Sequence, residues 1–175
     1  GRLRGFFDIV ATDMPCSGEG MFRKDEEAVR QWSPSLVAQC AARQREIIAD
    51  IWDALRPGGY LIYSTCTFNR QENEEIINHI IEEYGAGTVD IAVNPDWNIS
   101  PGIGTTAHCY RFMQHRTCGE GLFIAVLRKP GQYQGCAVKA KKGKIQPVPK
   151  QCRSFVREDS GTVLTADGTE VTALP

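Results

Sequence analysis

The sequence predicts an α/β protein built on an open sheet. Two apolar runs, at residues 6–13 and 60–65, are each followed by turn residues and are typical of strands buried in a parallel sheet. Between them, residues 33–55 carry apolar side chains at helical spacing. The order strand, helix, strand is typical of parallel strands joined by a right-handed crossover.

The first predicted helix has clear start and stop signals. Ser33 is suited to the N-cap, and Pro34 occupies the first helical position. The "RPGG" stretch at 56–59 is expected to end the helix before the second strand begins.

A second helix and further strands are predicted after residue 65. Asn69 and Glu72 resemble a capping box, and the helix is expected to stop at Gly85. Residues 121–129 form a third strand run, the polar stretch before it suits the other arm of a hairpin, and 88–93 is a weaker strand candidate. The apolar stripe of the helix consists of Ile76, Ile77, Ile80, Ile81 and Tyr84.

Composition is that of a soluble globular protein. The 175 residues are 42% hydrophobic and 23% charged, and the net charge of -1 favours no class of partner by itself. No apolar run reaches the length that spans a bilayer, and no signal peptide opens the chain. Seven irregularly spaced cysteines without a CxxC pair do not form a disulfide framework, so a cytoplasmic location is predicted.

The chain is expected to divide into three parts. Residues 1–130 form the α/β unit, 131–153 a basic linker without acids, and 154–175 the start of a second, β-containing domain with two strands around "ADGT". Two interpretations of the lysine-rich linker stay open: contact with an RNA backbone, or exposure to solvent without a partner.

The α/β unit is expected to be part of a longer protein, because its first strand follows the chain start directly and a doubly wound sheet has more strands. That strand then has an open edge, which predicts self-association.

Two cysteines stand at the ends of predicted strands. Cys16 follows the first strand in "DMPCSG", and Cys66 follows the second in "YSTCTF". If these strands are parallel neighbours, about 4.8 Å apart, both thiols face one crevice beside Asp13. That arrangement suits attack by a thiolate on an electron-poor carbon.

Other readings of the cysteines stay open. A free cysteine is often a small buried hydrophobe, as expected of Cys40 on the helix stripe. A redox pair of Cys16 and Cys66 is the alternative chemistry. Cys109, His115 and Cys118 are candidate metal ligands by residue type, but they lack a standard ligand spacing and no metal site is predicted. No role is assigned to four cysteines: Cys109, Cys118, Cys136 and Cys152.

Three segments carry a resemblance to a known family. "DMPCSGEGMFRKD", "LRPGGYLIYSTCTFNRQENE" and "CYRFMQHRTCGEGLFIAVLRK" together resemble the Sun-type RNA cytosine-5 methyltransferases, especially the bacterial group that modifies small-subunit ribosomal RNA. The resemblance spans roughly residues 5–130. It implies the catalytic, C-terminal half of a Rossmann-like methyltransferase sheet, followed by the start of an RNA-binding domain.

The resemblance also implies a reaction. Cys66, in the TC motif, is the expected nucleophile toward carbon-6 of an RNA cytosine, and S-adenosylmethionine is the expected methyl donor. Cys16, in the PC motif, is expected to aid product release. DNA cytosine methyltransferases instead resemble each other in a PC nucleophile followed by an ENV segment, which is missing here, so RNA is favoured. A non-catalytic RNA-binding module and a thiol redox protein are the alternatives.

Further residues receive roles only through this resemblance. Asp13 and Pro15 are expected near the cofactor, and Gly18 and Gly20 are expected to allow tight turns. The family's main cofactor motifs lie upstream of the matched segments, so weak cofactor binding and no activity are expected of this chain alone. Gln114 stands at a position where this family commonly has a proline. The candidate RNA contacts are Arg23, Lys24, Arg111 and His115.

Overall fold

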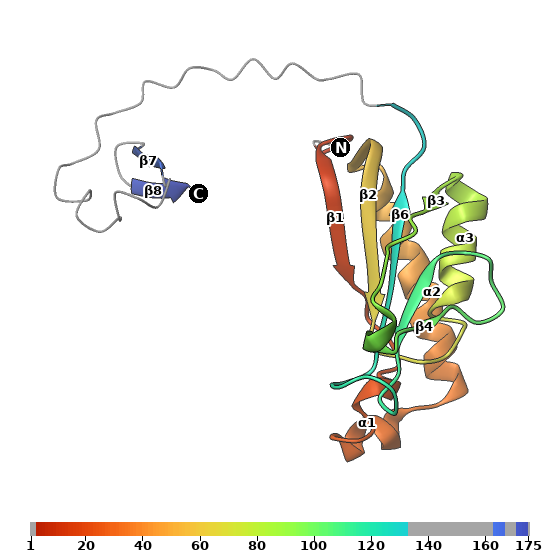
Figure 1. The fold of residues 1–175 in the computed structure, drawn as a ribbon. Helices are drawn as coiled ribbons and strands as arrows, with labels where there is room; N and C mark the ends of the chain where they lie inside the picture. Colours follow the sequence, from red (N-terminus) through yellow and green to blue (C-terminus); the bar gives the residue numbers. More distant parts are fainter. Residues whose placement is uncertain (1–2, 133–162, 167–170, 175) are drawn as a thin grey trace. The chain divides into compact units, whose positions relative to one another are not determined.

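The computed structural model describes residues 3–132, 163–166 and 171–174 (Figure 1). Contacts divide the chain into two units, Gly1–Gln134 and Gly135–Pro175. In the second unit, β7 (Val163–Ala166) pairs antiparallel with β8 (Val171–Leu174), in agreement with the strand pair predicted around "ADGT". Almost all of the predicted basic linker lies outside the described residues.

The first unit is built on a six-stranded mixed sheet. β1 (Phe7–Asp13) runs parallel to its neighbour β2 (Leu55–Thr65), as predicted. β6 (Leu122–Arg128) lies antiparallel on the other side of β2, and β5 (Cys109–Phe112) is its hairpin partner. The short strands β4 (Ser100–Pro101) and β3 (Gly87–Thr88) pair with β5 and β6 respectively.

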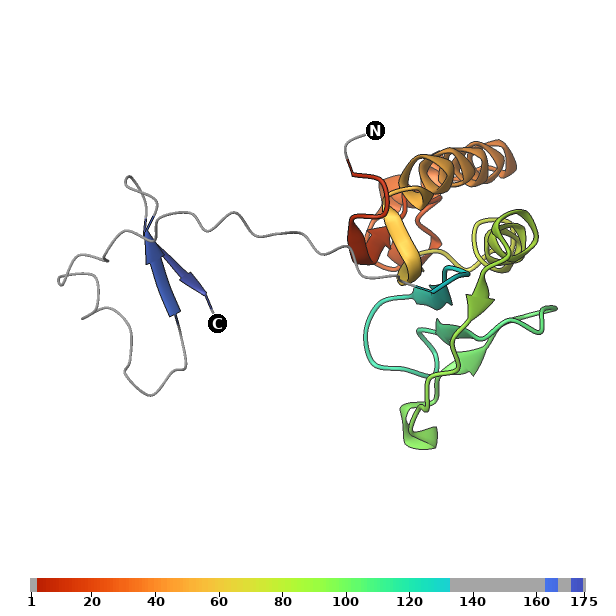
Figure 2. The same ribbon diagram turned by 90° about the horizontal axis from the view of Figure 1, so that it is seen from above.

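Two helices cover the same face of this sheet, as Figure 2 shows: α2 (Pro34–Trp52) and α3 (Glu74–Tyr84). Alternate strand residues, such as Leu61, Tyr63 and Phe123, are buried against Ile48 and Ile77 from the helices. The connections contain the short helices α1 (Glu26–Gln31), η1 (Glu19–Met21) and η2 (Pro95–Trp97). Among the described residues, no helix is both long and apolar enough to cross a membrane.

Helix α2 begins as predicted but ends earlier. The Ser33 hydroxyl accepts a hydrogen bond from the Leu36 amide at 3.1 Å. The helix stops at Trp52, because "RPGG" belongs to β2, where an irregular register opposite β1 accommodates it. Lys129 Nζ donates to the carbonyls of Trp52 and Leu55 at 2.6 and 2.8 Å, so it satisfies acceptors at the helix end.

Two other element predictions need correction. Helix α3 begins at Glu74 with Asn73 as its N-cap, so Asn69 and Glu72 form a turn ahead of the helix and not its capping box. Only Thr88 of the 88–93 run belongs to a strand, β3, although the Val89 amide still donates to the Val126 carbonyl.

Strand β1 is more exposed than its apolar sequence predicts. Within the described residues β1 pairs with β2 alone, and the side chains of Phe7 and Ile9 are 37% and 56% exposed. An apolar strand edge of this kind is a template for pairing with another chain.

Self-association through β1 therefore stays a prediction with a direct test. In sedimentation velocity, the chain is expected to form concentration-dependent oligomers that Ile9→Lys reduces, because a charge at the apolar edge disfavours strand pairing. Ile91→Lys, at an exposed position outside β1, is the matched control and is expected to leave them unchanged. A purely monomeric wild-type chain would count against this interface.

Candidate active site

The two cysteine loops meet at the carboxyl ends of β1 and β2. Asp13 is paired in register with Ser64, and the Met14 amide continues the ladder by donating to the Ser64 carbonyl at 3.0 Å. The next residues bring Cys16 Sγ to 3.3 Å from Cys66 Sγ. The two thiols predicted to share one crevice are therefore in hydrogen-bonding contact, and both are partly exposed.

This contact separates the pKa values of the two thiols. The hydrogen bond between the two sulfurs lowers the pKa of Cys66 to about 7, against the opposing effects of burial and the Asp13 charge. The pKa of Cys16 is raised far above its ordinary value by the same hydrogen bond, by burial and by the charge of Cys66. Near pH 7 Cys66 is therefore about half ionised, and it is Cys66 rather than Cys16 that loses its proton first.

Gly20 permits a close approach to the backbone of Cys66. Its amide donates to the Cys66 carbonyl at 2.7 Å, and a Cβ at this position would lie 2.5 Å from that carbonyl oxygen. The Gln114 side chain donates to the Gly20 carbonyl at 2.6 Å. Gln114, at the position where the Sun-type resemblance implies a proline, therefore helps to hold the loop that contacts Cys66.

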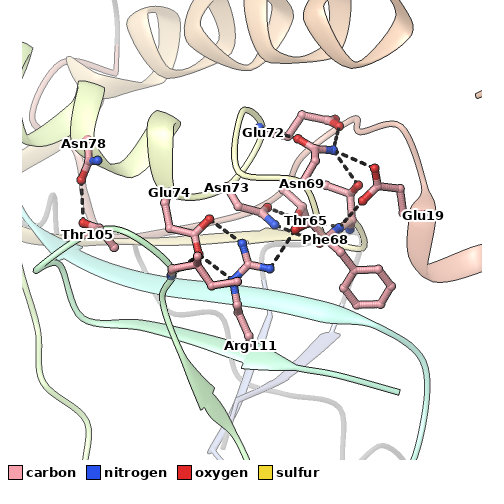
Figure 3. A network of polar contacts seen from close by, with 12 residues as sticks. Glu19, Thr65, Phe68, Asn69, Glu72, Asn73, Glu74, Asn78, Thr105 and Arg111 are labelled. Carbon is pink, nitrogen blue, oxygen red and sulfur yellow. Dashed lines mark hydrogen bonds and ion pairs between the residues drawn. The ribbon is translucent and has the colours of Figure 1, made fainter. Parts of the chain in front are cut away.

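A buried polar network lies beneath the cysteine loops (Figure 3). The Glu72 carboxylate accepts from the Ser17 amide at 2.8 Å and from the Ser17 hydroxyl at 2.6 Å. Asn69 Nδ2 donates to the same carboxylate at 2.5 Å. Ser17 follows Cys16 and Asn69 lies shortly after Cys66, so this network joins the two loops.

Comparison with known proteins gives the family. A model described as 16S rRNA methyltransferase RsmB/F matches residues 2–128. The chain belongs to this family. Ribosomal RNA small subunit methyltransferase F of Erwinia tasmaniensis is 44% identical over 126 residues, which are 70% of this chain and 26% of that protein. The protein of the same name from Aliivibrio fischeri is 34% identical over 169 residues, 95% of this chain and 36% of the relative.

A solved structure shows the same fold. The crystal structure of NSun6 from Pyrococcus horikoshii with SFG matches with a TM-score of 0.59 and 31% identity, over 70% of this chain and 30% of that chain. The Sun-type resemblance and the Rossmann-like methyltransferase fold are thus confirmed. The chain itself spans about a quarter to a third of the length of these RsmB/F relatives.

Within this RsmB/F unit, Arg111 does not lie where the sequence suggested. Its side chain is buried, and it donates through Nε and Nη2 to the two oxygens of Glu74, each at 2.5 Å (Figure 3). Its Nη1 donates to the Phe68 carbonyl at 2.8 Å. The expected RNA contact is therefore corrected to a structural role: Arg111 joins β5 to α3 and to the loop that follows Cys66.

The other candidate RNA contacts are exposed. Lys24 Nζ lies 2.8 Å and Arg23 Nη2 lies 3.5 Å from a carboxylate oxygen of Glu120, so both cations share one acid. His115 is also exposed and lies beside Gln114 in the loop after β5. RNA binding by these three residues stays a prediction.

The residues expected near a cofactor are exposed as well. Asp13 and Pro15 flank buried Met14 at the mouth of the site, and the Pro15 carbonyl accepts from Gln44 Nε2 at 3.0 Å.

Cys109 lies buried in the core with its pKa raised by burial to about 12, which suits a structural thiol. Cys136 and Cys152 lie outside the described residues.

Sequence reasoning missed three residues of the site: Ser17, Gln44 and Glu72. Glu72 lies in "RQENEE", where the acids and amides resemble an ordinary helix start. Its partners Ser17 and Gln44 are 55 and 28 residues away in the sequence, so no local pattern links them. The sequence offered one indirect signal for Glu72: it is an acid a few residues after Cys66, the candidate nucleophile at the end of a predicted strand.

Proposed function

We propose that this chain is the catalytic part of an enzyme that methylates carbon-5 of cytosine in small-subunit ribosomal RNA, with S-adenosylmethionine as methyl donor and Cys66 as nucleophile. The observation that carries the proposal is the cysteine pair, with its sulfurs 3.3 Å apart and the pKa of Cys66 lowered to about 7. Membership of the RsmB/F family and the names of its ribosomal RNA methyltransferase relatives support ribosomal RNA as the substrate class.

The proposed reaction begins with the Cys66 thiolate. Its sulfur adds to carbon-6 of the cytosine, and the electron pair of the 5,6 double bond makes carbon-5 nucleophilic. S-adenosylmethionine, when bound, supplies the electrophilic methyl group. A base then removes the carbon-5 proton, and the electron pair of that bond restores the double bond and expels the Cys66 thiolate. The target base must leave any stack to reach these partly buried sulfurs.

Cys16 is proposed to act on the sulfur that leaves. Its thiol donates to the Cys66 sulfur, so negative charge on that sulfur is stabilised as the carbon–sulfur bond breaks. The same donor is needed at the start, when Cys66 is a free thiolate. One hydrogen bond therefore serves both addition and release.

The described residues suit one end of the cofactor. Asp13 presents an exposed carboxylate beside Cys66, which is a suitable acceptor for the amino or hydroxyl groups of S-adenosylmethionine. Asp13 and Pro15 are therefore the residues proposed to contact it. The prediction that this chain alone binds the cofactor weakly or not at all is checked by calorimetric titration, in which micromolar affinity would contradict it.

The function is tested by a grafted enzyme, defined as the Erwinia tasmaniensis relative in which the matching segment of this chain replaces the aligned 126 residues. The grafted enzyme is incubated with unmodified small-subunit ribosomal RNA and S-adenosylmethionine, and the nucleosides are analysed by mass spectrometry. The expected product is 5-methylcytidine. Methylation of another base or of another position of cytosine would overturn the proposed reaction.

The lowered pKa of Cys66 predicts a pH profile for alkylation. In the whole chain, iodoacetamide is expected to react with Cys66 at a half-maximal rate near pH 7, because the thiolate is the nucleophile. Cys16→Ala removes the donor, so at pH 7 about five-fold slower reaction is expected, the loss of thiolate being partly offset by its greater nucleophilicity. Above about pH 9 the variant is expected to react faster than the wild type.

Peptide mass spectrometry measures this rate for Cys66 separately from the other thiols. Cys40→Ala, which changes another partly exposed cysteine, on α2, is the matched control and is expected to leave the profile of Cys66 unchanged. A profile centred near pH 9 in the wild type would contradict the assignment of Cys66 as the thiolate.

Thiol redox chemistry is the second candidate function, favoured by the 3.3 Å separation of the sulfurs. The two thiols would give two electrons and two protons to a small disulfide, which would leave as two thiols, while Cys16 and Cys66 become linked. Titration with oxidised glutathione tests this. A redox function requires a reversible Cys16–Cys66 bond and no 5-methylcytidine from the grafted enzyme.

A further inference from the structure

Glu72 lies completely buried between the two cysteine loops. Its two oxygens hold Ser17 from both sides, since Oε1 accepts from the Ser17 amide and Oε2 from the Ser17 hydroxyl. Oε2 also accepts from Asn69 Nδ2 at 2.5 Å, and the Glu72 amide donates back to Asn69 Oδ1 at 2.9 Å (Figure 3). One carboxylate thus connects the residue after Cys16 with the loop after Cys66.

Glu72 is itself held by surrounding elements. The Tyr63 hydroxyl, on β2, donates to its carbonyl at 2.6 Å, and Gln44 Nε2, on α2, lies 3.5 Å from Oε1. The same Gln44 nitrogen donates to the Pro15 carbonyl, so the segment from Pro15 to Ser17 is bound at two points. The position of the Cys16 backbone therefore depends on Glu72 and on the groups that fix it.

The donors to this carboxylate are a backbone amide, a hydroxyl and side-chain amides, all without formal charge. Burial of a carboxylate among neutral donors is unfavourable compared with burial of an apolar or amide side chain. Stability alone gives no reason for an acid here. A role in arranging the site does, because one carboxylate oxygen can accept from two donors at once, as Oε2 does from Ser17 and Asn69.

We propose that Glu72 is a positioning residue that holds the Cys16 thiol within hydrogen-bonding distance of the Cys66 sulfur. The inference rests on the proposed function, because it concerns the nucleophile assigned there. Glu72 hydrogen-bonds to neither sulfur, so it acts through its contacts with Ser17 on one side and Asn69 on the other.

The proposal predicts the direction in which the pKa of Cys66 changes when Glu72 is replaced. The negative charge of Glu72 by itself opposes ionisation of Cys66, so loss of that charge alone would lower the pKa of Cys66. Loss of positioning would remove the hydrogen bond from Cys16 and would raise this pKa toward its ordinary value. The direction of the change therefore separates positioning from a simple effect of charge.

The test is the alkylation profile of Cys66 in Glu72→Gln, measured with iodoacetamide on the whole chain. Glutamine places an NH₂ group where Oε2 accepts two hydrogen bonds, or turns that group toward the Ser17 amide. We expect the midpoint of the profile to rise by about one pH unit or more, and the rate at pH 7 to fall several-fold. Glu75→Gln, at an exposed acid in the first turn of α3, is the matched control and is expected to change neither. An unchanged or lowered midpoint in Glu72→Gln overturns the proposal.

Two further variants keep the test decisive. Ser17→Ala retains the backbone amide and removes one contact, so it is expected to shift the midpoint in the same direction by less, and it decides the question if circular dichroism shows Glu72→Gln to be unfolded. In a Cys16→Ala background, Glu72→Gln is expected to cause no further rise, because the hydrogen bond is already lost. A further rise there overturns the proposal.

The readout uses neither RNA nor cofactor, so it is independent of methyl transfer. If the grafted enzyme makes no 5-methylcytidine while Glu72→Gln raises the midpoint, the proposed function fails and the positioning role stands. If methylation occurs and the midpoint does not rise, the positioning role fails alone.

Discussion

Replacement of Cys66 by alanine in the grafted enzyme is expected to abolish methyl transfer, with a loss of at least about 10⁴-fold. The physical reason is that carbon-5 of cytosine is a poor nucleophile until a thiolate has added to carbon-6. Binding of RNA should survive, because Cys66 is one partly exposed side chain in a loop that other residues hold in place. Filter binding and 5-methylcytidine formation measure the two properties separately.

Replacement of Cys16 by alanine is expected to make the covalent protein–RNA complex accumulate, whereas Cys66→Ala prevents its formation. Loss of its hydrogen bond slows attack by Cys66 only about five-fold at pH 7. Loss of a positioned proton donor slows departure of the sulfur by roughly 10²-fold or more. The adduct therefore forms faster than it decays, and a protein–RNA band that survives denaturing electrophoresis should appear.

The double variant is the control for this interpretation. Cys16→Ala combined with Cys66→Ala should give no covalent band, since the nucleophile is missing. If the band persists in the double variant, the adduct involves another residue. If Cys66→Ala retains methylation while Cys16→Ala loses it, the roles of the two thiols are reversed and the enzyme resembles the DNA methyltransferases with a PC nucleophile.

The meeting of the two cysteines could be predicted because it depends on local patterns and one topological rule. Two apolar runs, each followed by turn residues, indicated strands, and the helix between them indicated that the strands are parallel. Neighbouring parallel strands end at the same edge of the sheet. The approximate positions of Cys16 and Cys66 follow from this, but their 3.3 Å contact does not, because it depends on how two loops distant in sequence pack together, as in the contacts of Glu72 with Ser17 and Asn69.

What sequence reasoning missed depends on contacts between distant residues. "RPGG" is typical of a helix stop, yet it belongs to β2, because Leu55 and Tyr60 on either side of it pair with β1, and Gly58 and Gly59 hydrogen-bond to the backbone of Lys129. Arg111 reads as a surface cation, but it shares the alternating buried face of β5 with Cys109, and its partner Glu74 is 37 residues away. In a strand, residues two apart lie on the same face. The position of Arg111 two residues after Cys109 was therefore the local sequence signal for its burial.

The pairing of Arg111 with Glu74 predicts a large effect on stability. Arg111→Ala is expected to lower the free energy of unfolding by about 3–5 kcal/mol, because it leaves the buried carboxylate of Glu74 without its countercharge and the Phe68 carbonyl without Nη1. The Ile103 amide, which donates to Glu74 at 2.9 Å, offsets only part of the loss. Urea denaturation followed at 222 nm measures the change, since α2 and α3 dominate that signal.

A matched control and a compensating variant separate this ion pair from a general loss of packing. Arg116→Ala removes an exposed arginine that donates to Ser100, and it is expected to cost less than about 1 kcal/mol. Arg111→Met combined with Glu74→Gln removes both charges, and it should recover much of the stability, because burial of an isolated charge accounts for most of the cost. If Arg111→Ala were no more destabilising than Arg116→Ala, the pair would be dispensable.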